Sequence, residues 1–418
     1  MGATTIEKIL ARTAGRSVVR PGEIVVCRPD MVVQLDLTIS TDGSWYRPLR
    51  IFDPERVALI FDHSVPAPTI RDAEGMSRGR AFAREFGLKH FFDVGEHGIS
   101  HQIVAEHGLA VPGELLVCPD SHTCAVGALN CAGRGVGPID TIQAMTKGVV
   151  WYQVAPTIRY ELTGRLPHGV YGKDVLFYIA QTYGHHANVS LEFGGAGLAD
   201  LPLSERWVIS TMAAELGAEF ALFDPDDVLL AACEGRSVRP PTPVAPDPDA
   251  DYADVRPIDL SLLEPYVVLP DAVPNNGLPI GALRDRIEVQ QAFIGSCANG
   301  KLEDLRVAAR ILRGRRVAPG VRLIITPASQ KIYLDALREG IIDTLMEAGA
   351  VVTNATCGAC FGHHMGVLGP GETCITASTR NFKGRMGAAS ARIFMGSPAT
   401  VAASAVAGSI TDPRGYLA

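Results

Sequence analysis

The sequence predicts an α/β fold built on mainly parallel sheets. Short apolar runs that end in glycine or a polar residue alternate with amphipathic stretches, most regularly in the last third of the chain. This strand–helix alternation is typical of parallel sheets covered by helices. A length of 418 residues indicates two to three domains, and a hydrophobic content of 47% can supply a large core.

The elements can be predicted in chain order for three parts, residues 1–160, 161–285 and 286–418. In the first part we expect helices over residues 5–14, 78–86 and 103–107, a turn and strand over 20–26, and strands over 31–36, 56–61, 91–93 and 114–118. In the second we expect helices over 173–180 and 207–217, a strand over 190–194, and a surface loop rich in Pro and Asp over 239–257. In the third, helices over 303–312, 330–339 and 341–348 alternate with strands over 289–294, 321–326, 351–353 and 374–377.

Composition and charge exclude several classes of protein. The net charge of −7 argues against a nucleic-acid surface, which needs a basic stripe. No run of 18 apolar residues could span a membrane, and the first residues lack the pattern of a secretory signal. Nine cysteines in a long chain of this kind are expected to be reduced thiols, so we expect a cytoplasmic location.

Three cysteines lie beside small residues at predicted strand ends. Cys297 follows Gly295 and Ser296, and Cys357 and Cys360 form a Cys-x-x-Cys pair. Three thiolates can hold three irons of a [4Fe–4S] cluster and leave the fourth iron open, and a three-thiolate zinc site is the main alternative. We expect the other six to be buried free thiols: Cys27, Cys118, Cys124, Cys131, Cys233 and Cys374.

Candidate acids and bases also follow predicted strands. They are Asp62, His63, His101, Asp120 and His122. A histidine held by a carboxylate can donate a proton near neutral pH, although each of these histidines alone could be structural. Glu215 is expected four residues after Thr211 on one helix face, as a proton-relay group or a buried acceptor.

Two arginines follow the last predicted strand. Arg380 and Arg385 flank Asn381-Phe382-Lys383-Gly384. Guanidinium groups bind carboxylates in a bidentate manner, so the pair could hold an anionic substrate. The alternative is that both arginines pair with acidic groups of the chain itself.

Taken together, these motifs resemble the aconitase superfamily, and most closely the group of 3-isopropylmalate dehydratase large subunits. The resemblance covers nearly the whole chain and is carried by Phe61-Asp62-His63, Gly98-Ile99-Ser100-His101, Asp120-Ser121-His122-Thr123, Gly295-Ser296-Cys297, Cys357-Gly358-Ala359-Cys360, Pro370-Gly371-Glu372, Arg380-Asn381-Phe382 and the run over 396–413.

The resemblance implies three α/β domains around a [4Fe–4S] cluster with one open iron. It implies cluster ligands Cys297, Cys357 and Cys360, substrate contacts from Ser121, Arg380 and Arg385, and a proton-transfer group of Asp62, His63, His101, Asp120, His122 and Glu215. The implied reaction removes water from a 2-hydroxy acid and adds it back at the neighbouring carbon, as in leucine biosynthesis. In relatives of this length the swivel domain, with its serine base, is a separate small subunit, so we expect this chain to be inactive alone.

Four positions depart from the usual motifs. Ala298 stands where threonine is usual, Thr211 and Thr379 stand where asparagine is usual, and Pro119 replaces a glycine. The substrate therefore stays open among 3-isopropylmalate, homocitrate, dimethylmalate and citramalate. Two other classes also stay open: an inactive iron-sensing binding protein and a zinc-stabilised scaffold.

Overall fold

The computed structural model describes residues 2–40, 45 and 47–417. The fold is α/β with mainly parallel sheets, as predicted. Its strands form three large sheets that follow one another along the chain, within residues 31–135, 157–259 and 266–395. The two predicted domain boundaries do not coincide with the limits of the sheets. The boundary at 160/161 lies within the strand Thr157–Thr163, and the third sheet begins at Tyr266, before the boundary at 285/286.

The first sheet has five parallel strands. In spatial order they are β4 (His90–Phe92), β3 (Val57–Ile60), β2 (Met31–Leu35), β5 (Leu115–Cys118) and β6 (Ala132–Gly135). All residues of β2, β3 and β5 are buried. Continuous apolar strands of this kind are typical of a parallel sheet that is covered on both faces.

The second sheet has four parallel strands. They are β10 (Ala221–Phe223), β9 (Ser190–Gly194), β8 (Thr157–Thr163) and β11 (Asp254–Asp259), in that order. The predicted loop over 239–257 is therefore wrong at its end, because β11 begins at Asp254. Pro257 is accommodated since β11 is an edge strand, where one missing backbone donor costs little.

The third sheet has seven strands, of which five are parallel. The spatial order is β13 (Gly277–Pro279), β12 (Tyr266–Val268), β18 (Arg392–Met395), β17 (Thr373–Thr376), β14 (Gln291–Ile294), β15 (Arg322–Ile325) and β16 (Val351–Val352). The five strands from β18 to β16 are parallel, and β12 is antiparallel to both of its neighbours. A separate two-stranded ribbon pairs β1 (Ile24–Cys27) with β7 (Val150–Gln153).

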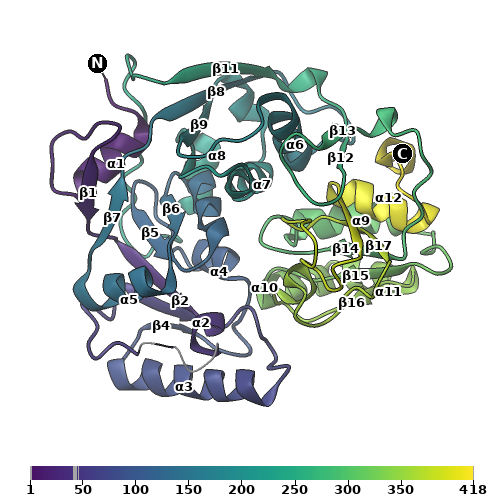
Figure 1. The fold of residues 1–418 in the computed structure, drawn as a ribbon, viewed down its shortest axis with the longest axis horizontal. Helices are drawn as coiled ribbons and strands as arrows, with labels where there is room; N and C mark the ends of the chain where they lie inside the picture. Colours follow the sequence, from purple (N-terminus) through teal and green to yellow (C-terminus); the bar gives the residue numbers. More distant parts are fainter. Residues whose placement is uncertain (1, 41–44, 46, 418) are drawn as a thin grey trace.

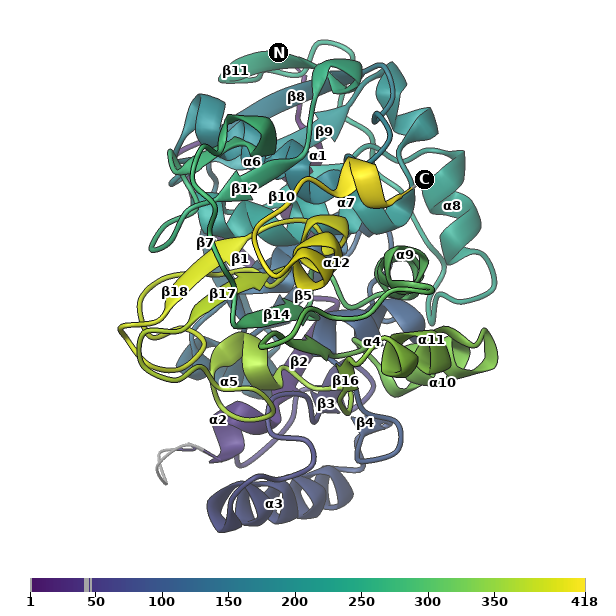
Figure 2. The same cartoon turned by 90° about the vertical axis from the view of Figure 1, so that its right-hand side faces the viewer.

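Helices cover these sheets. They are α1 (Thr5–Thr13), α2 (Asp36–Ser40), α3 (Ile70–Phe86), α4 (Ser100–Glu106), α5 (Pro138–Lys147), α6 (Gly172–Tyr183), α7 (Leu203–Met212), α8 (Asp227–Cys233), α9 (Leu302–Leu312), α10 (Gln330–Arg338), α11 (Ile341–Glu347) and α12 (Pro398–Ala407). Figure 1 shows the third sheet and α9 to α12 at the right, beside the purple and teal elements of the first two sheets. Figure 2 turns this C-terminal part toward the viewer.

Two helices differ most from their predicted limits. The helix predicted over 78–86 begins at Ile70, because the Thr69 side chain accepts a hydrogen bond from the Asp72 amide and caps an earlier turn. The helix predicted over 207–217 ends at Met212 and continues as a 3-10 turn. Among the described residues, no helix combines the length and apolar composition that a bilayer crossing requires.

A buried carboxyl group fastens the N-terminal helix to the second sheet. Glu192 on β9 is 1% exposed and accepts hydrogen bonds from the Ile6 amide and the Tyr252 hydroxyl, each at 2.9 Å. Burial raises the pKa of Glu192 to about 7. Because an unfolded glutamate has a pKa of about 4.3, the stability from its protonated form is complete below that pH and is lost as pH rises through about 7.

We therefore expect Glu192→Gln to gain stability relative to the parent chain as pH rises. The glutamine keeps an acceptor for the Ile6 amide and never becomes charged. From about pH 5 to about pH 8, the unfolding free energy of the variant minus that of the parent chain should rise by about 2 kcal/mol. Urea unfolding at both pH values measures it. Glu96→Gln, at an exposed position, is the control, and an equal Glu192→Gln effect at both values would contradict the expectation.

Candidate active site

The candidate residues of the first sheet lie at one edge. Asp62 and His63 directly follow β3, and Asp120 follows β5. Since β3 and β5 flank β2 and all three are parallel, their carboxyl ends share that edge. Ligands of open α/β sheets gather at such edges.

His63 is held in place from two sides. Its Nδ1 hydrogen-bonds the Asp62 carboxylate, and both residues are buried. Below them, the buried Asp36 carboxylate accepts the backbone amides of Asp62 (3.2 Å), His63 (3.1 Å) and Ser64 (2.8 Å). Burial lowers the pKa of His63, but Asp62, Asp36 and Asp120 outweigh it and raise that pKa to about 9. Burial raises the pKa of Asp36 to about 7.

Asp120 lies among three histidines. Its Oδ1 is 2.9 Å from His101 Nε2 and accepts the His122 backbone amide at 2.8 Å, and its Oδ2 is 3.8 Å from His63 Nε2. Burial alone would raise the pKa of Asp120. The hydrogen bonds and charges of His101 and His122 instead hold it well below its usual value. Asp120 is therefore the charged acceptor of this histidine group.

Glu215 joins parts of the chain that lie far apart in sequence. Its Oε1 is 2.8 Å from His122 Nε2 and accepts from Arg380 Nε at 2.8 Å. Arg380 also donates to the Ser121 hydroxyl at 2.7 Å. Although burial would raise the pKa of Glu215, His122 and Arg380 lower it.

The sequence suggested that Glu215 and Thr211 share one face of a helix, and this prediction is wrong. It sits on the 3-10 turn Ala213–Leu216, after α7 has ended at Met212. The Thr211 hydroxyl turns back and donates to the Trp207 carbonyl of its own helix at 2.6 Å. The direction of the Glu215 carboxylate, toward His122 and Arg380, is therefore set by the 3-10 turn and not by an α-helix.

The first candidate thiol is presented by a tight loop after β14. Ser296 adopts a φ of 91°, and its hydroxyl accepts the backbone amides of Ala298 (3.2 Å) and Asn299 (3.4 Å). The Trp207 indole donates to the Cys297 carbonyl at 2.9 Å. His122 lies within hydrogen-bonding contact of the Cys297 thiol.

The other two candidate thiols follow β16. Cys357 is half-buried and Cys360, on the 3-10 turn Gly358–Phe361, is buried. Arg385 donates to the Cys360 carbonyl at 2.9 Å, and its Nη2 is 3.9 Å from the Cys360 sulfur. Contact with Cys357 outweighs burial and, with the charges of Arg385 and His122, lowers the pKa of Cys360 well below its usual value. The remaining six cysteines are buried free thiols, as predicted.

Hydrogen bonds tie the loops of the third sheet to the edge of the first. The Asp62 carbonyl accepts from the Thr356 hydroxyl at 2.9 Å and from the Cys357 amide at 3.0 Å. Because β14, β16 and β17 are in one parallel run, their following loops share an edge as well. The structure thus brings thiols, arginines and carboxylate–histidine pairs to one place.

Three residues that we did not predict as functional support this place. They are Asp36, Trp207 and Lys173. The fully buried Lys173 donates to Asn299 Oδ1 at 3.0 Å and to the Ala377 and Ser378 carbonyls, and so joins the loops after β14 and β17. Asp36, at the end of an apolar run, gives a signal that the group must be paired if it is buried, but the sequence does not show with what.

Two of the residues that depart from the usual motifs, Thr379 and Ala298, have different surroundings. The buried Thr379 hydroxyl faces the Cys360 sulfur at 4.0 Å. Ala298 packs in the core of the second sheet. The residue at position 379 thus places a hydroxyl beside a candidate thiol.

Comparison with known proteins gives matches along nearly the whole chain. The model of the aconitase family (aconitate hydratase) matches residues 9–408. A 3-isopropylmalate dehydratase large subunit of Mycolicibacterium smegmatis is 56% identical over 418 residues, covering 100% of this chain and 98% of that protein.

More distant organisms carry similar proteins. The 3-isopropylmalate dehydratase large subunit of Aquifex aeolicus is 43% identical, covering 99% of this chain and 97% of that protein. Large subunit 1 of Methanopyrus kandleri is 41% identical, with 100% of both chains covered. The family match and these full-length identities lead to one conclusion: the chain belongs to the aconitase family.

Proposed function

We propose that this chain is the large subunit of an iron–sulfur hydro-lyase that acts on 3-isopropylmalate together with a separate small subunit. The names of its full-length relatives support this substrate and this partner. A cytoplasmic location accords with nine free thiols. The observation that carries the proposal is the meeting of soft sulfur donors, guanidinium groups and carboxylate–histidine pairs at facing strand ends.

The donor set fits a [4Fe–4S] cluster. Cys297, Cys357 and Cys360 would hold it, and thiolates are the usual ligands of such clusters. His122 beside Cys297 and Arg385 beside Cys360 favour the anionic sulfur that coordination requires. When bound, the cluster supplies an iron that polarises the hydroxyl group of the substrate.

Arg380, Arg385 and Ser121 would bind the substrate carboxylates. Arg380 is already oriented by Glu215 and Ser121, and Arg385 by the Cys360 carbonyl, so little side-chain entropy remains to be lost on binding. Guanidinium groups held in this way favour a planar carboxylate over a neutral group. Both arginines lie at the sheet edge that bears the thiols.

The carboxylate–histidine pairs would act as proton donors and acceptors in the reaction. In the dehydration, a proton leaves the carbon next to a carboxylate and a hydroxyl leaves the neighbouring carbon as water. Both return at exchanged positions. His63 with Asp62, His101 with Asp120, and His122 with Glu215 can each hold a proton for the departing hydroxyl and take it back. We propose that the small subunit supplies the base for the carbon-bound proton.

The thiol assignment predicts different outcomes for two cysteine variants. We expect Cys360→Ser, prepared without oxygen, to lose cluster absorbance, iron and labile sulfide. Its activity should fall more than the roughly 10- to 100-fold typical of outer-shell changes. Cys374→Ser is the control, because that buried thiol lies on β17 within the sheet and should leave the cluster intact. Zinc without iron or sulfide in the parent chain would contradict the assignment.

The partner assignment predicts that activity needs two chains. We expect the cluster-loaded chain alone to be inactive toward 3-isopropylmalate. Addition of a separate small subunit should produce the conjugated alkene acid, followed by its ultraviolet absorbance. Turnover by the single chain would disprove the need for a partner. Dimethylmalate, citramalate and homocitrate in parallel would test the substrate.

The support of His63 by Asp36 predicts a selective loss of rate. Asp36→Asn keeps the size but replaces one acceptor oxygen by a donor that faces backbone amides. We expect kcat to fall by about 10- to 100-fold with little change in KM, because displaced catalytic groups lose rate more than binding.

Asp226→Asn is the matched control for this change. Asp226 also accepts a backbone amide, from Leu229 at 3.0 Å, and pairs with Arg206 of α7, but it has no contact with the strand-end histidines among the described residues. Its replacement should lower thermal stability and leave kcat near the parent value. Equal kcat values for Asp36→Asn and the parent would show that His63 does not depend on Asp36.

A further inference from the structure

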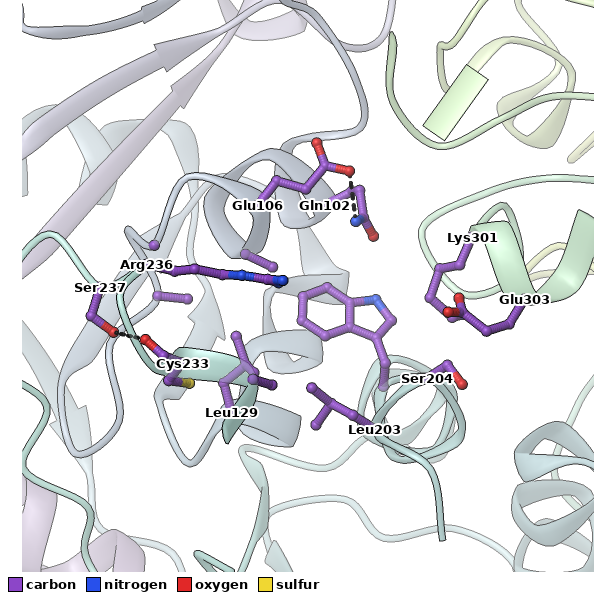
Figure 3. Close-up of a pocket in the computed structure, with 15 residues that line it drawn as sticks. Gln102, Glu106, Leu129, Leu203, Ser204, Cys233, Arg236, Ser237, Lys301 and Glu303 are labelled. Atoms are coloured by element: carbon purple, nitrogen blue, oxygen red, sulfur yellow. Dashed lines mark hydrogen bonds between the residues drawn. The ribbon is translucent and has the colours of Figure 1, made fainter. Parts of the chain in front are cut away.

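We propose that a cavity between α4, α7, α8 and α9 binds a small α-amino acid with an apolar side chain. The cavity has a volume of about 240 Å³ and lies outside the proposed active site. Figure 3 shows Arg236 reaching toward the cavity from one side, Lys301 and Glu303 on the opposite side, and Glu106 beside Gln102 at the upper edge. Its lining comes from α4, α7 and α8, from Lys301 just before α9, and from Glu303 in the first turn of α9.

The cavity has an apolar wall. Leu129, Leu203 and Trp207 line it, together with alanines of α4 and α8. Leu129 and Trp207 are 6% and 4% exposed, so they are fixed parts of the protein interior. A branched or aromatic side chain would gain free energy by leaving water for this wall. The volume is below the roughly 300–1,000 Å³ of pockets for drug-sized ligands and suits a molecule of amino-acid size.

The positive group of the cavity is available. Within the part of the chain that the structure describes, the Arg236 guanidinium has no hydrogen-bond or ion-pair partner. By contrast Lys301 is engaged by the Ala298 carbonyl and Asp304. A guanidinium that is free and faces a concave surface is suited to a ligand carboxylate.

The negative groups of the cavity are available too. Glu106 uses Oε1 to accept from Gln102 (2.9 Å) and Ser329 (2.7 Å), and no hydrogen bond of its Oε2 occurs among the described residues. Glu303 is exposed, and its one ion pair with a described residue is a loose one with Arg306, at 3.8 Å. Two carboxylates disfavour a dianion, and a simple amine would leave Arg236 unused. A ligand with one charge of each sign satisfies both sides.

The cavity adjoins residues that hold the proposed site. Trp207, in its wall, donates to the Cys297 carbonyl, and Gln102 directly follows His101 on α4. Lys301 contacts the carbonyl of Ala298, next to Cys297. A bound amino acid would therefore contact the supports of the Cys297 loop and of His101 without touching the substrate.

Isothermal titration of the full chain with L-leucine and three reduced analogues tests the proposal. 4-Methylpentanoate lacks the ammonium group, 3-methylbutan-1-amine lacks the carboxylate, and glycine lacks the apolar side chain. We expect leucine to bind and each analogue to bind at least about tenfold more weakly, because each loses one group of contacts. No binding of leucine, L-valine or L-phenylalanine would overturn the proposal, as would equal binding of leucine and an analogue.

Two variants locate the binding. Arg236→Gln should weaken leucine binding at least about tenfold, the loss expected for one charge-assisted hydrogen bond, and leave activity of the two-subunit enzyme without leucine unchanged. Arg313→Gln, at an exposed position outside the cavity, is the matched control and should bind leucine like the parent. Unchanged leucine binding by Arg236→Gln would place the amino acid elsewhere and overturn the proposal.

Discussion

One carboxylate oxygen, Glu215 Oε1, holds the candidate site together. It accepts from His122, which belongs to the first sheet, and from Arg380, which follows a strand of the third. Glu215 itself follows α7, which packs on the second sheet. Because two positively polarised donors converge on one half-buried acceptor, the orientation of each constrains the other. The geometry of the site therefore depends on the relative positions of all three sheets.

The pKa values of two carboxyl groups in this region are shifted in opposite directions. Asp36 is fully buried, whereas Asp120 is partly buried, with its side chain 21% exposed. Asp120 faces the imidazoles of His101 and His122, which lower its pKa. Asp36 accepts three backbone amides and lies against the Asp62 carboxyl group, so burial and that neighbour raise its pKa. Deeper burial and a carboxyl neighbour thus make Asp36 easier to protonate, whereas imidazole partners keep Asp120 charged.

Much of the architecture could be predicted because parallel strands are continuous apolar runs. The strands that lead to Asp62, Asp120 and Cys297 were visible for this reason, and their shared direction brought the candidates together. Sequence could not show that Lys173 and Asp36 are supports, because their partners are backbone groups of distant loops. It also missed β11, where pairing with β8 overrides a composition that favours a loop. It also missed the 3-10 turn at Glu215, because the spacing of residues along the sequence does not show that the α-helix ends at Met212.

The contact between Thr356 and the carbonyl of Asp62 joins residues 294 positions apart. A ribosome must therefore release most of the polypeptide before the two ends of this bond can meet. Until then two of the thiols that will oppose the early histidines have not been synthesised. The candidate site can therefore form only after most of the polypeptide has been made, and a product truncated before Thr356 would hold the early histidines without Cys357 and Cys360.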